Sequence, residues 1–370
     1  MSVFDDLVGQ RDVTDVLTAA VAGDGMSHAW LFTGPPGSGR SVAARAFAAA
    51  LQCPAGGCGG CTQCQQVRAR THPDVVFVTP AGLSISVDEA RDVVHRAAMS
   101  ASGARWRIVL IEDADRLTER AANVWLKAIE EPAPGSVFLL CAPSAEDLPP
   151  TIRSRCRLLT LRLPTADDVA LVLMRRDGVD PTMARWAAVA SMGHVGRARA
   201  LALDESARAE RTAVLELPRR LATVGDALAA AADLVAEAEE SSDRGTSAAA
   251  KAETEAFAAV AGKARGSAGL YADLAKRQKS RETRARRDAL DRALVDLAAL
   301  YRDVLAVQFG ASDEVVHADQ IALTRRMAQN STPDSTIRRA DAVLACREAL
   351  DLNANVLLAV EQLALALRAG

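Results

Sequence analysis

The sequence lacks the long apolar segments that insert into membranes. None of its 370 residues lies in a run of about 18 apolar positions, the minimum for a membrane-spanning helix. Residues 1–6 are acidic and no hydrophobic run follows them, which argues against a signal peptide. We therefore expect a cytoplasmic protein without a membrane span.

A strong net charge and dispersed cysteines are also missing. The formal net charge is only −3, which argues against a chain that grips nucleic acid along its whole length and leaves a local contact open. Of the seven cysteines, four are gathered in residues 53–64. This distribution is typical of a metal site in a reducing compartment and argues against a disulfide framework.

The first part of the chain alternates between apolar runs and helical patterns. The continuously apolar runs are 29–32, 75–78, 108–111 and 137–140. Parallel strands that are buried on both faces of a sheet have this composition. Helical patterns occupy 13–21, 42–51, 86–100 and the segment from Thr118 to Pro132, which stops the helix. Ser86 and Glu89 form a possible capping box at the start of the third. The alternation predicts a doubly wound α/β domain over 1–163.

Strand signals end at Pro164. Residues 165–176, 181–190 and a segment from Val195 predict short helices, which together form a small helical domain over 164–206. The rest, 207–370, is Ala/Leu-rich and helical in pattern, so we expect a third, all-helical domain. A polar interruption near 239–269 predicts a mobile loop or an extended hairpin.

A glycine-rich turn separates the first expected strand from the next helix. It reads Gly34-Pro35-Pro36-Gly37-Ser38-Gly39-Arg40-Ser41. Its glycines allow backbone N–H groups to surround phosphate oxygens at a helix N-terminus, and Ser41 stands where a hydroxyl ligates magnesium. Arg40 replaces the consensus lysine, and a planar guanidinium is a poor substitute for a compact ammonium. We expect a phosphate loop with little or no hydrolysis; binding of ATP and Mg²⁺ stays open, as does a plain turn without a ligand.

Two acids follow the third expected strand. At this position a carboxylate normally holds magnesium and a second one activates water. Glu112 and Asp113 supply both, in the order opposite to the usual Asp-Glu, and a carboxylate misplaced by about 1 Å can cost on the order of a hundredfold in rate. The alternative is a solvated acidic turn. The reversed order again argues against efficient hydrolysis.

The cysteine cluster has the spacing Cys53-x₄-Cys58-x₂-Cys61-x₂-Cys64. Four thiolates on a short segment rich in glycine can close tetrahedrally on zinc, with no position left open, which predicts a structural Zn²⁺ ion. An iron–sulfur cluster is the competitor, but the order of spacings differs from common ferredoxin runs. The other three cysteines are expected to be packed or idle thiols.

These motifs occur in an order that resembles the clamp-loader ATPase (AAA+) family of bacterial DNA polymerase III. The residues that carry the resemblance are the segment from His28 to Gly37, the cysteine cluster, the segment from Asn123 to Pro132 (NVWLKAIEEP) and Ser154-Arg155-Cys156. The resemblance covers about 200 residues closely. It implies an AAA+ nucleotide-binding domain with an inserted zinc module, a lid domain and a helical collar that mediates oligomerisation.

Within that family the chain resembles the delta-prime branch more than the motor subunits. Four departures from the motor pattern point this way: Arg40, the Glu112-Asp113 order, Ala142-Pro143 at a sensor threonine, and Gly196 at a sensor arginine. The resemblance implies an inactive ATP site in a ring with gamma/tau and delta subunits that loads the sliding clamp on primed DNA. It also implies that Arg155 reaches a neighbouring subunit's ATP in trans.

Two other functions stay open from the sequence. The chain can be a motor-type subunit that hydrolyses its own ATP with Arg40 in the lysine's role, or a zinc-stabilised nucleic-acid-binding module with a vestigial loop. The basic run 276–287 favours neither, because it lacks interleaved aromatics and predicts a solvated helical face. Steady-state ATPase of the isolated chain separates the first alternative from the delta-prime-like interpretation, and titration of the isolated chain with DNA tests the second.

Overall fold

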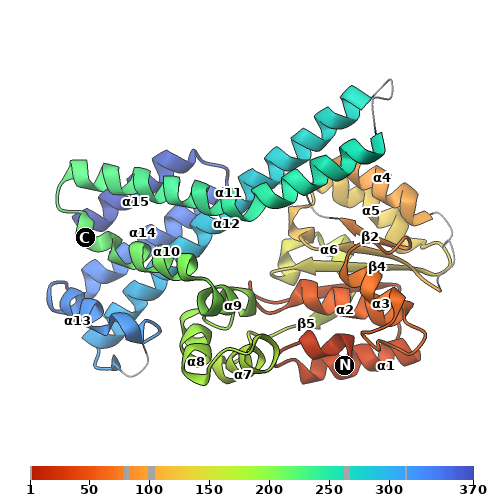
Figure 1. Cartoon of the computed structure of the whole chain (residues 1–370), viewed down its shortest axis with the longest axis horizontal. Coiled ribbons are helices and arrows are strands. Elements are labelled where there is room, and N and C mark those ends of the chain that lie inside the picture. Colours follow the sequence, from red (N-terminus) through yellow and green to blue (C-terminus); the bar gives the residue numbers. More distant parts are fainter. Residues whose placement is uncertain (1, 79, 81–83, 99–104, 262–266, 313–314) are drawn as a thin grey trace. The chain divides into compact units, whose positions relative to one another are not determined.

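The structure is a computed structural model that describes residues 2–78, 80, 84–98, 105–261, 267–312 and 315–370 (Figure 1). The chain divides into two compact units, Met1–Arg199 and Ala200–Gly370. The predicted three-domain division stays a prediction. In the part of the chain that the structure describes, no helix is long and apolar enough to cross a membrane.

A five-stranded parallel sheet forms the centre of the first unit. Its strands lie in the order β2-β3-β4-β1-β5. Their bounds are β1 Ala29–Thr33, β2 Val75–Val78, β3 Arg107–Ile111, β4 Ser136–Ala142 and β5 Arg157–Thr160. Leu31 of β1 pairs with Leu140 of β4 on one side and Leu158 of β5 on the other. The predicted parallel α/β fold is confirmed, and the first four strands match the four apolar runs.

Helices cover both faces of this sheet (Figure 1). One face packs against α1 (Arg11–Ala22), α2 (Arg40–Gln52) and α3 (Thr62–Arg68), and the other against α4 (Val87–Ala98) and α5 (Glu119–Glu130). Alternate strand residues serve the two cores: Trp30 meets Phe47 of α2 at 5.0 Å between ring centroids, and Phe138 meets Trp125 of α5 at 6.0 Å.

Local signals explain where several helices begin. Ser86 and Glu89 form the predicted capping box before α4, with backbone N–H to side-chain distances of 2.8 and 3.3 Å. Thr118 accepts a hydrogen bond from the Ala121 N–H and caps α5. Residues 99 and 100, where the α4 helix was expected to end, lie outside the described residues. The remaining first-unit elements are η1 Val3–Asp6, η2 Ala114–Arg116, η3 Ala145–Asp147, α6 Pro150–Arg153, α7 Ala166–Asp177 and α8 Pro181–Ala190, with α9 Val195–Leu203 at the boundary.

The regular elements among the described residues of the second unit are all helices. Its helices are α10 Glu205–Glu216, η4 Leu217–Arg220, α11 Val224–Ala261, α12 Ser267–Gln308, η6 Ala318–Gln320, α13 Ile321–Gln329, α14 Pro333–Asp351 and α15 Val356–Ala369. Leu290, Leu297 and Tyr301 of α12 are buried in its core. The segment 239–269 is helical in α11 and at the start of α12, and residues 262–266 lie outside the described residues. Its mobility stays a prediction.

Candidate functional site

The glycine-rich turn joins the buried strand β1 to the N-terminus of α2. Gly34, Gly37 and Gly39 have φ values of 146°, 89° and 92°, a region that side chains disfavour. Gly37 also has no room for a side chain, because an added Cβ would lie 2.9 Å from the Cβ of His194. The glycines are therefore required for this path of the backbone, which joins β1 to α2 in the predicted order of strand, turn and helix.

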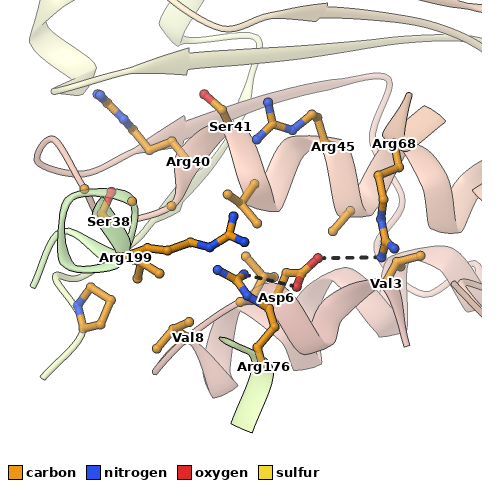
Figure 2. A pocket seen from close by; sticks show the side chains of 18 of the residues that line it. Val3, Asp6, Val8, Ser38, Arg40, Ser41, Arg45, Arg68, Arg176 and Arg199 are labelled. Carbon is orange, nitrogen blue, oxygen red and sulfur yellow. Dashed lines mark ion pairs between the residues drawn. The ribbon is translucent and has the colours of Figure 1, made fainter. Parts of the chain in front are cut away.

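A cavity of about 560 Å³ lies beside this turn (Figure 2). Residues 37–42 of the turn and α2 line it, together with η1 and the start of α9. Its charged lining is strongly cationic, because Asp6 is the one acid among the residues that line it. The cations are Arg40, Arg45, Arg68, Arg176 and Arg199. A cavity with this lining is suited to an anion.

Three of these arginines are paired with Asp6 or Asp177. Asp6 lies 3.7 Å from Arg68 and 3.8 Å from Arg176, as Figure 2 shows. Asp177 lies 2.9 Å from Arg199 and 3.4 Å from Arg176. These pairs hold the arginine heads at the cavity and reduce, without cancelling, its positive charge.

Two polar atoms of the turn lie buried without a partner among the described residues. They are the Oγ of Ser38, whose residue is 2% exposed, and the Nη1 of Arg40. Both residues line the cavity. Since buried polar groups are nearly always hydrogen-bonded, these two atoms indicate a place for a ligand or ordered water.

Glu112 follows β3, as predicted, but its carboxylate is occupied. Arg45 of α2 donates to Oε1 at 2.8 Å, and Arg70 donates to Oε1 at 2.8 Å and to Oε2 at 2.9 Å. The neighbouring Asp113 precedes η2, and burial raises the pKa of Asp115. A carboxylate bonded to two guanidinium groups is not available to a metal ion. Arg45 and Arg70 were not singled out from the sequence.

The four cysteines come together at the end of α2 and the start of α3. Their Sγ atoms all lie within 4.8 Å of one another, and Cys53 Sγ lies 3.6 Å from Cys58 and 3.7 Å from Cys61. A zinc–sulfur tetrahedron with bonds of about 2.3 Å has edges of about 3.8 Å, so the donors fit zinc. The cluster was predicted, and its geometry permits a metal such as zinc.

The surroundings of the cluster favour the thiolate form at Cys53 and disfavour it at Cys64. Burial raises the pKa of Cys53, but backbone N–H groups of Cys58, Gly57 and Ala55 outweigh it and lower that pKa to about 6. Burial raises the pKa of Cys64 to about 12. Gly57 has a φ of 113°, and a Cβ there would lie 2.8 Å from Val3. The glycines thus fold the segment tightly enough for its N–H groups to face sulfur.

Arg155 lies between α6 and the edge strand β5, with its side chain partly exposed. Its Nη1 donates to the Thr151 carbonyl at 2.9 Å and to Ser154 Oγ at 3.1 Å, and its Nη2 lies 2.6 Å from Glu130 Oε1. The structure therefore joins two motifs that the sequence analysis treated separately. Three acceptors hold the guanidinium in one orientation at the surface.

The fold and the site define the class: a parallel α/β protein with a glycine-rich turn before α2, a four-cysteine cluster that permits a metal such as zinc, and a helical unit. Two family profiles match the chain, "DNA polymerase III, delta subunit" at residues 9–165 and its C-terminal counterpart at 285–368. The chain belongs to the delta-prime family of bacterial DNA polymerase III clamp-loader subunits. The predicted resemblance is confirmed.

Individual relatives agree. The chain is similar to DNA polymerase III subunit delta' of Bacillus subtilis, with 27% identity over 98% of this chain and 97% of that protein. It is 40% identical to subunit delta' of Pseudomonas aeruginosa over 38% of this chain and 44% of that protein. It is 31% identical to subunit tau of Bacillus subtilis over 45% of this chain and 30% of that protein. The first match runs nearly end to end, and the other two span less than half of either chain.

Proposed function

We propose that the chain is a largely non-hydrolysing subunit of a DNA polymerase III clamp loader. It braces a ring of homologous ATPases that opens the sliding clamp and places it on primed DNA. The observation that carries the non-hydrolysing role is the double occupation of Glu112 by Arg45 and Arg70. This adds a structural reason to the arginine at the lysine position of the loop.

The ring partners follow from the family. Gamma/tau and delta subunits are the proposed neighbours, and the sliding clamp and primed DNA are contacted through the complex. The relatives include proteins named tau and gamma/tau, so the chain shares ancestry with the proposed neighbours. Homologous subunits pack in rings through equivalent surfaces.

Arg155 is the proposed contribution of this chain to a neighbour's ATP. An arginine supplied in trans stabilises the charge that develops during phosphoryl transfer. The guanidinium is partly exposed, is oriented by Thr151 and Ser154, and lies before an edge strand. These features suit a side chain that acts across an interface.

Cys53, Cys58, Cys61 and Cys64 are the proposed ligands of a structural zinc ion. When bound, the ion cross-links the end of α2 to the start of α3, with no open position for catalysis. The loop residues Gly34, Gly37, Gly39, Arg40 and Ser41 are the proposed contacts for a phosphate ligand held without turnover.

Reconstitution tests this function. The purified chain, mixed with gamma/tau and delta subunits of the same organism, should enter one complex of defined mass. The complex should load the clamp on primed DNA, and omission of this chain should abolish loading, while the chain alone should show negligible ATP turnover. Loading at full rate without the chain, or rapid turnover by the chain alone, would contradict the proposal.

A further inference from the structure

The cavity beside the glycine-rich turn has the charge of a ligand site, but the acid bonded to its lining residue Arg45, Glu112, is not available to a metal ion. Arg45 and Arg70 take both oxygens of this carboxylate, which is only 11% exposed. In a hydrolysing site of this class the equivalent acid supports magnesium. Magnesium binding here would require at least one of these charge-assisted hydrogen bonds to break.

The position of Arg45 strengthens this conflict with magnesium. Arg45 is four residues after Ser41 on α2, so the two side chains share one face of the helix. Arg45 both lines the cavity and bonds to Glu112, and Figure 2 shows its head group on the same side as Ser41. A guanidinium therefore lies next to the hydroxyl that would ligate the metal, where its charge repels a divalent cation.

Arg70 is held in place at a conformational cost. Its backbone φ is 60°, a left-handed value that costs a non-glycine residue free energy. Its guanidinium also lies 5.4 Å from the centre of the Phe77 ring, a cation–π contact. Arg70 lies two residues after the end of α3, the helix that has Cys61 as its N-cap and that contains Cys64. The segment that contains the cysteine cluster therefore also positions Arg70 beside Glu112.

We propose that this cavity binds phosphate anions, such as free nucleoside polyphosphates, without a divalent metal ion. Arg45 and Arg70 take the electrostatic place of the metal at Glu112. The ligand class follows from the cationic lining and from two buried atoms without partners, Ser38 Oγ and Arg40 Nη1. The inference rests on the phosphate-loop assignment in the proposed function.

The preference for the metal-free anion has an electrostatic reason. Magnesium reduces the negative charge of ATP, and a lining of several arginines gains more from the uncomplexed anion. Magnesium should therefore weaken ATP binding by about three- to tenfold, a moderate change because partly exposed charges are screened by solvent and salt. A hydrolysing phosphate-loop site shows the reverse dependence.

Calorimetric titration of the isolated chain with ATP tests this inference. Buffers should be freed of divalent ions on a chelating resin before protein is added, so that no chelator strips the cysteine cluster. We expect saturable binding without magnesium and weaker binding after magnesium is added. Tighter binding with magnesium, or no binding under either condition, would overturn the inference.

A second measurement uses Mn²⁺ alone, followed by its electron paramagnetic resonance signal. The wild-type chain should bind none at the loop, and Arg45→Ala/Arg70→Ala should gain one site that Glu112→Gln removes again. Arg45→Ala/Arg70→Gly repeats the test in a backbone that suits glycine, in case the first variant folds poorly. Arg91→Ala/Arg96→Ala removes two exposed arginines of α4 and should gain no site. A wild-type Mn²⁺ site lost in Glu112→Gln would overturn the inference.

These tests do not require a clamp loader. A chain that binds ATP without metal and fails to assemble with gamma/tau and delta would retain this inference and lose the proposed function. A chain that assembles and supports loading, yet requires magnesium to bind ATP, would do the opposite.

Discussion

At the scale of single residues, the proposed lack of hydrolysis does not depend on the loop arginine alone. Restoring the consensus with Arg40→Lys should leave ATP turnover negligible, because Arg45 and Arg70 still hold Glu112. The other proposed departures from the motor pattern, namely the Glu112-Asp113 order, Ala142-Pro143 and Gly196, also remain in this variant. Steady-state release of phosphate by the isolated variant measures this. Clear turnover in this single variant would show that the lysine alone was missing.

Arg155 gives the second prediction at this scale. Arg155→Ala should leave assembly intact and lower the DNA-stimulated ATP turnover of the reconstituted complex. Arginines supplied in trans raise the rate of ATP hydrolysis by roughly 10³–10⁵-fold where they dominate the chemistry. Only one of several ATP sites in the ring would lose its arginine, so the loss of turnover should be partial. Arg155→Lys should be nearly as harmful, because an ammonium lacks the planar fork.

The matched control for this experiment is Arg153→Ala. Arg153 lies two residues earlier, is partly exposed, and pairs with Glu146 at 3.5 Å. Its loss should leave turnover unchanged. If Arg155→Ala complexes turn over ATP like the wild type after equal assembly is verified, Arg155 has no role in trans and the chain acts only as a scaffold.

The sequence predicts the residues that share a motif and misses those that tertiary structure brings together. Gly37, Arg40 and Glu112 were found because a strand, a turn and a helix fix their positions locally. Arg70 and Arg176 come from distant segments, and neither has a distinctive neighbourhood in the sequence. Arg70 has a positive φ and pairs with Glu112, and both properties are visible only in the structure.

At the scale of elements, the zinc module can be tested with little damage to its helix. Cys61→Ser should remove the metal, which we expect at one zinc per chain in the wild type, and lower the thermal stability of the first unit. Cys61 is also the N-cap of α3, and serine caps helices well, so the loss should report the metal and not the cap. Elemental analysis and thermal unfolding measure both effects.

Cys156→Ser is the control for the zinc experiment. This thiol packs outside the cluster, where burial raises its pKa to about 12, and its replacement should leave the metal content unchanged. Iron and inorganic sulfide in the wild-type protein, or full zinc content in Cys61→Ser, would refute the assignment.

Burial explains which strands the sequence predicts. The central strand β4 is buried at every position and is continuously apolar after its first residue, Ser136. The edge strand β5, Arg157–Thr160, was not predicted, because only part of it is shielded and its residues are mixed in polarity. Periodicity detects burial and not pairing, so an exposed edge strand gives little signal.

At the scale of the whole molecule, the helical unit contains a buried charged cluster that no motif predicts. Asp303 of α12 is fully buried and accepts hydrogen bonds from the N–H groups of Val316 and His317 at 2.9 and 2.8 Å. The His317 ring lies 2.9 Å from Asp303 through Nδ1 and 3.8 Å from Asp296 through Nε2. Nearby, Arg211 of α10 forms a two-bonded pair with Asp319.

The cluster makes the stability of this unit depend on pH in both directions. Burial opposes a charge on His317, but the carboxylates of Asp296 and Asp303 outweigh it and raise its pKa. The stabilisation that protonated His317 contributes is therefore complete below the pKa of an unfolded histidine, about 6.5. It is lost as the pH rises through the higher pKa of His317 in the folded protein. Burial also opposes the charge of Asp303, yet hydrogen bonds from His317 and the backbone lower its pKa, so that contribution is lost on acidification.

Hydrogen exchange of α12 peptides, corrected for the intrinsic pH dependence, measures this effect. Protection should fall on the alkaline side in the wild type, and His317→Gln should remove that fall. The variant should also be less stable by about 3–5 kcal/mol, because two acids lose their buried cation. His95→Gln, on exposed α4, is the control and should change neither property. An unchanged alkaline profile in His317→Gln would show that the imidazole is uncharged in the folded protein.

The edge strand β5 has a consequence for how the protein must be produced. One side of this strand has no neighbouring strand in the described sheet, and Leu158 on it is 51% exposed. Open apolar edges recruit other chains and promote aggregation. Arg155 and Arg157 lie before and at the start of this strand, where their charge opposes such contacts. Overproduction of the chain without a partner to cover β5 should therefore lower its soluble yield, and balanced co-expression should restore it.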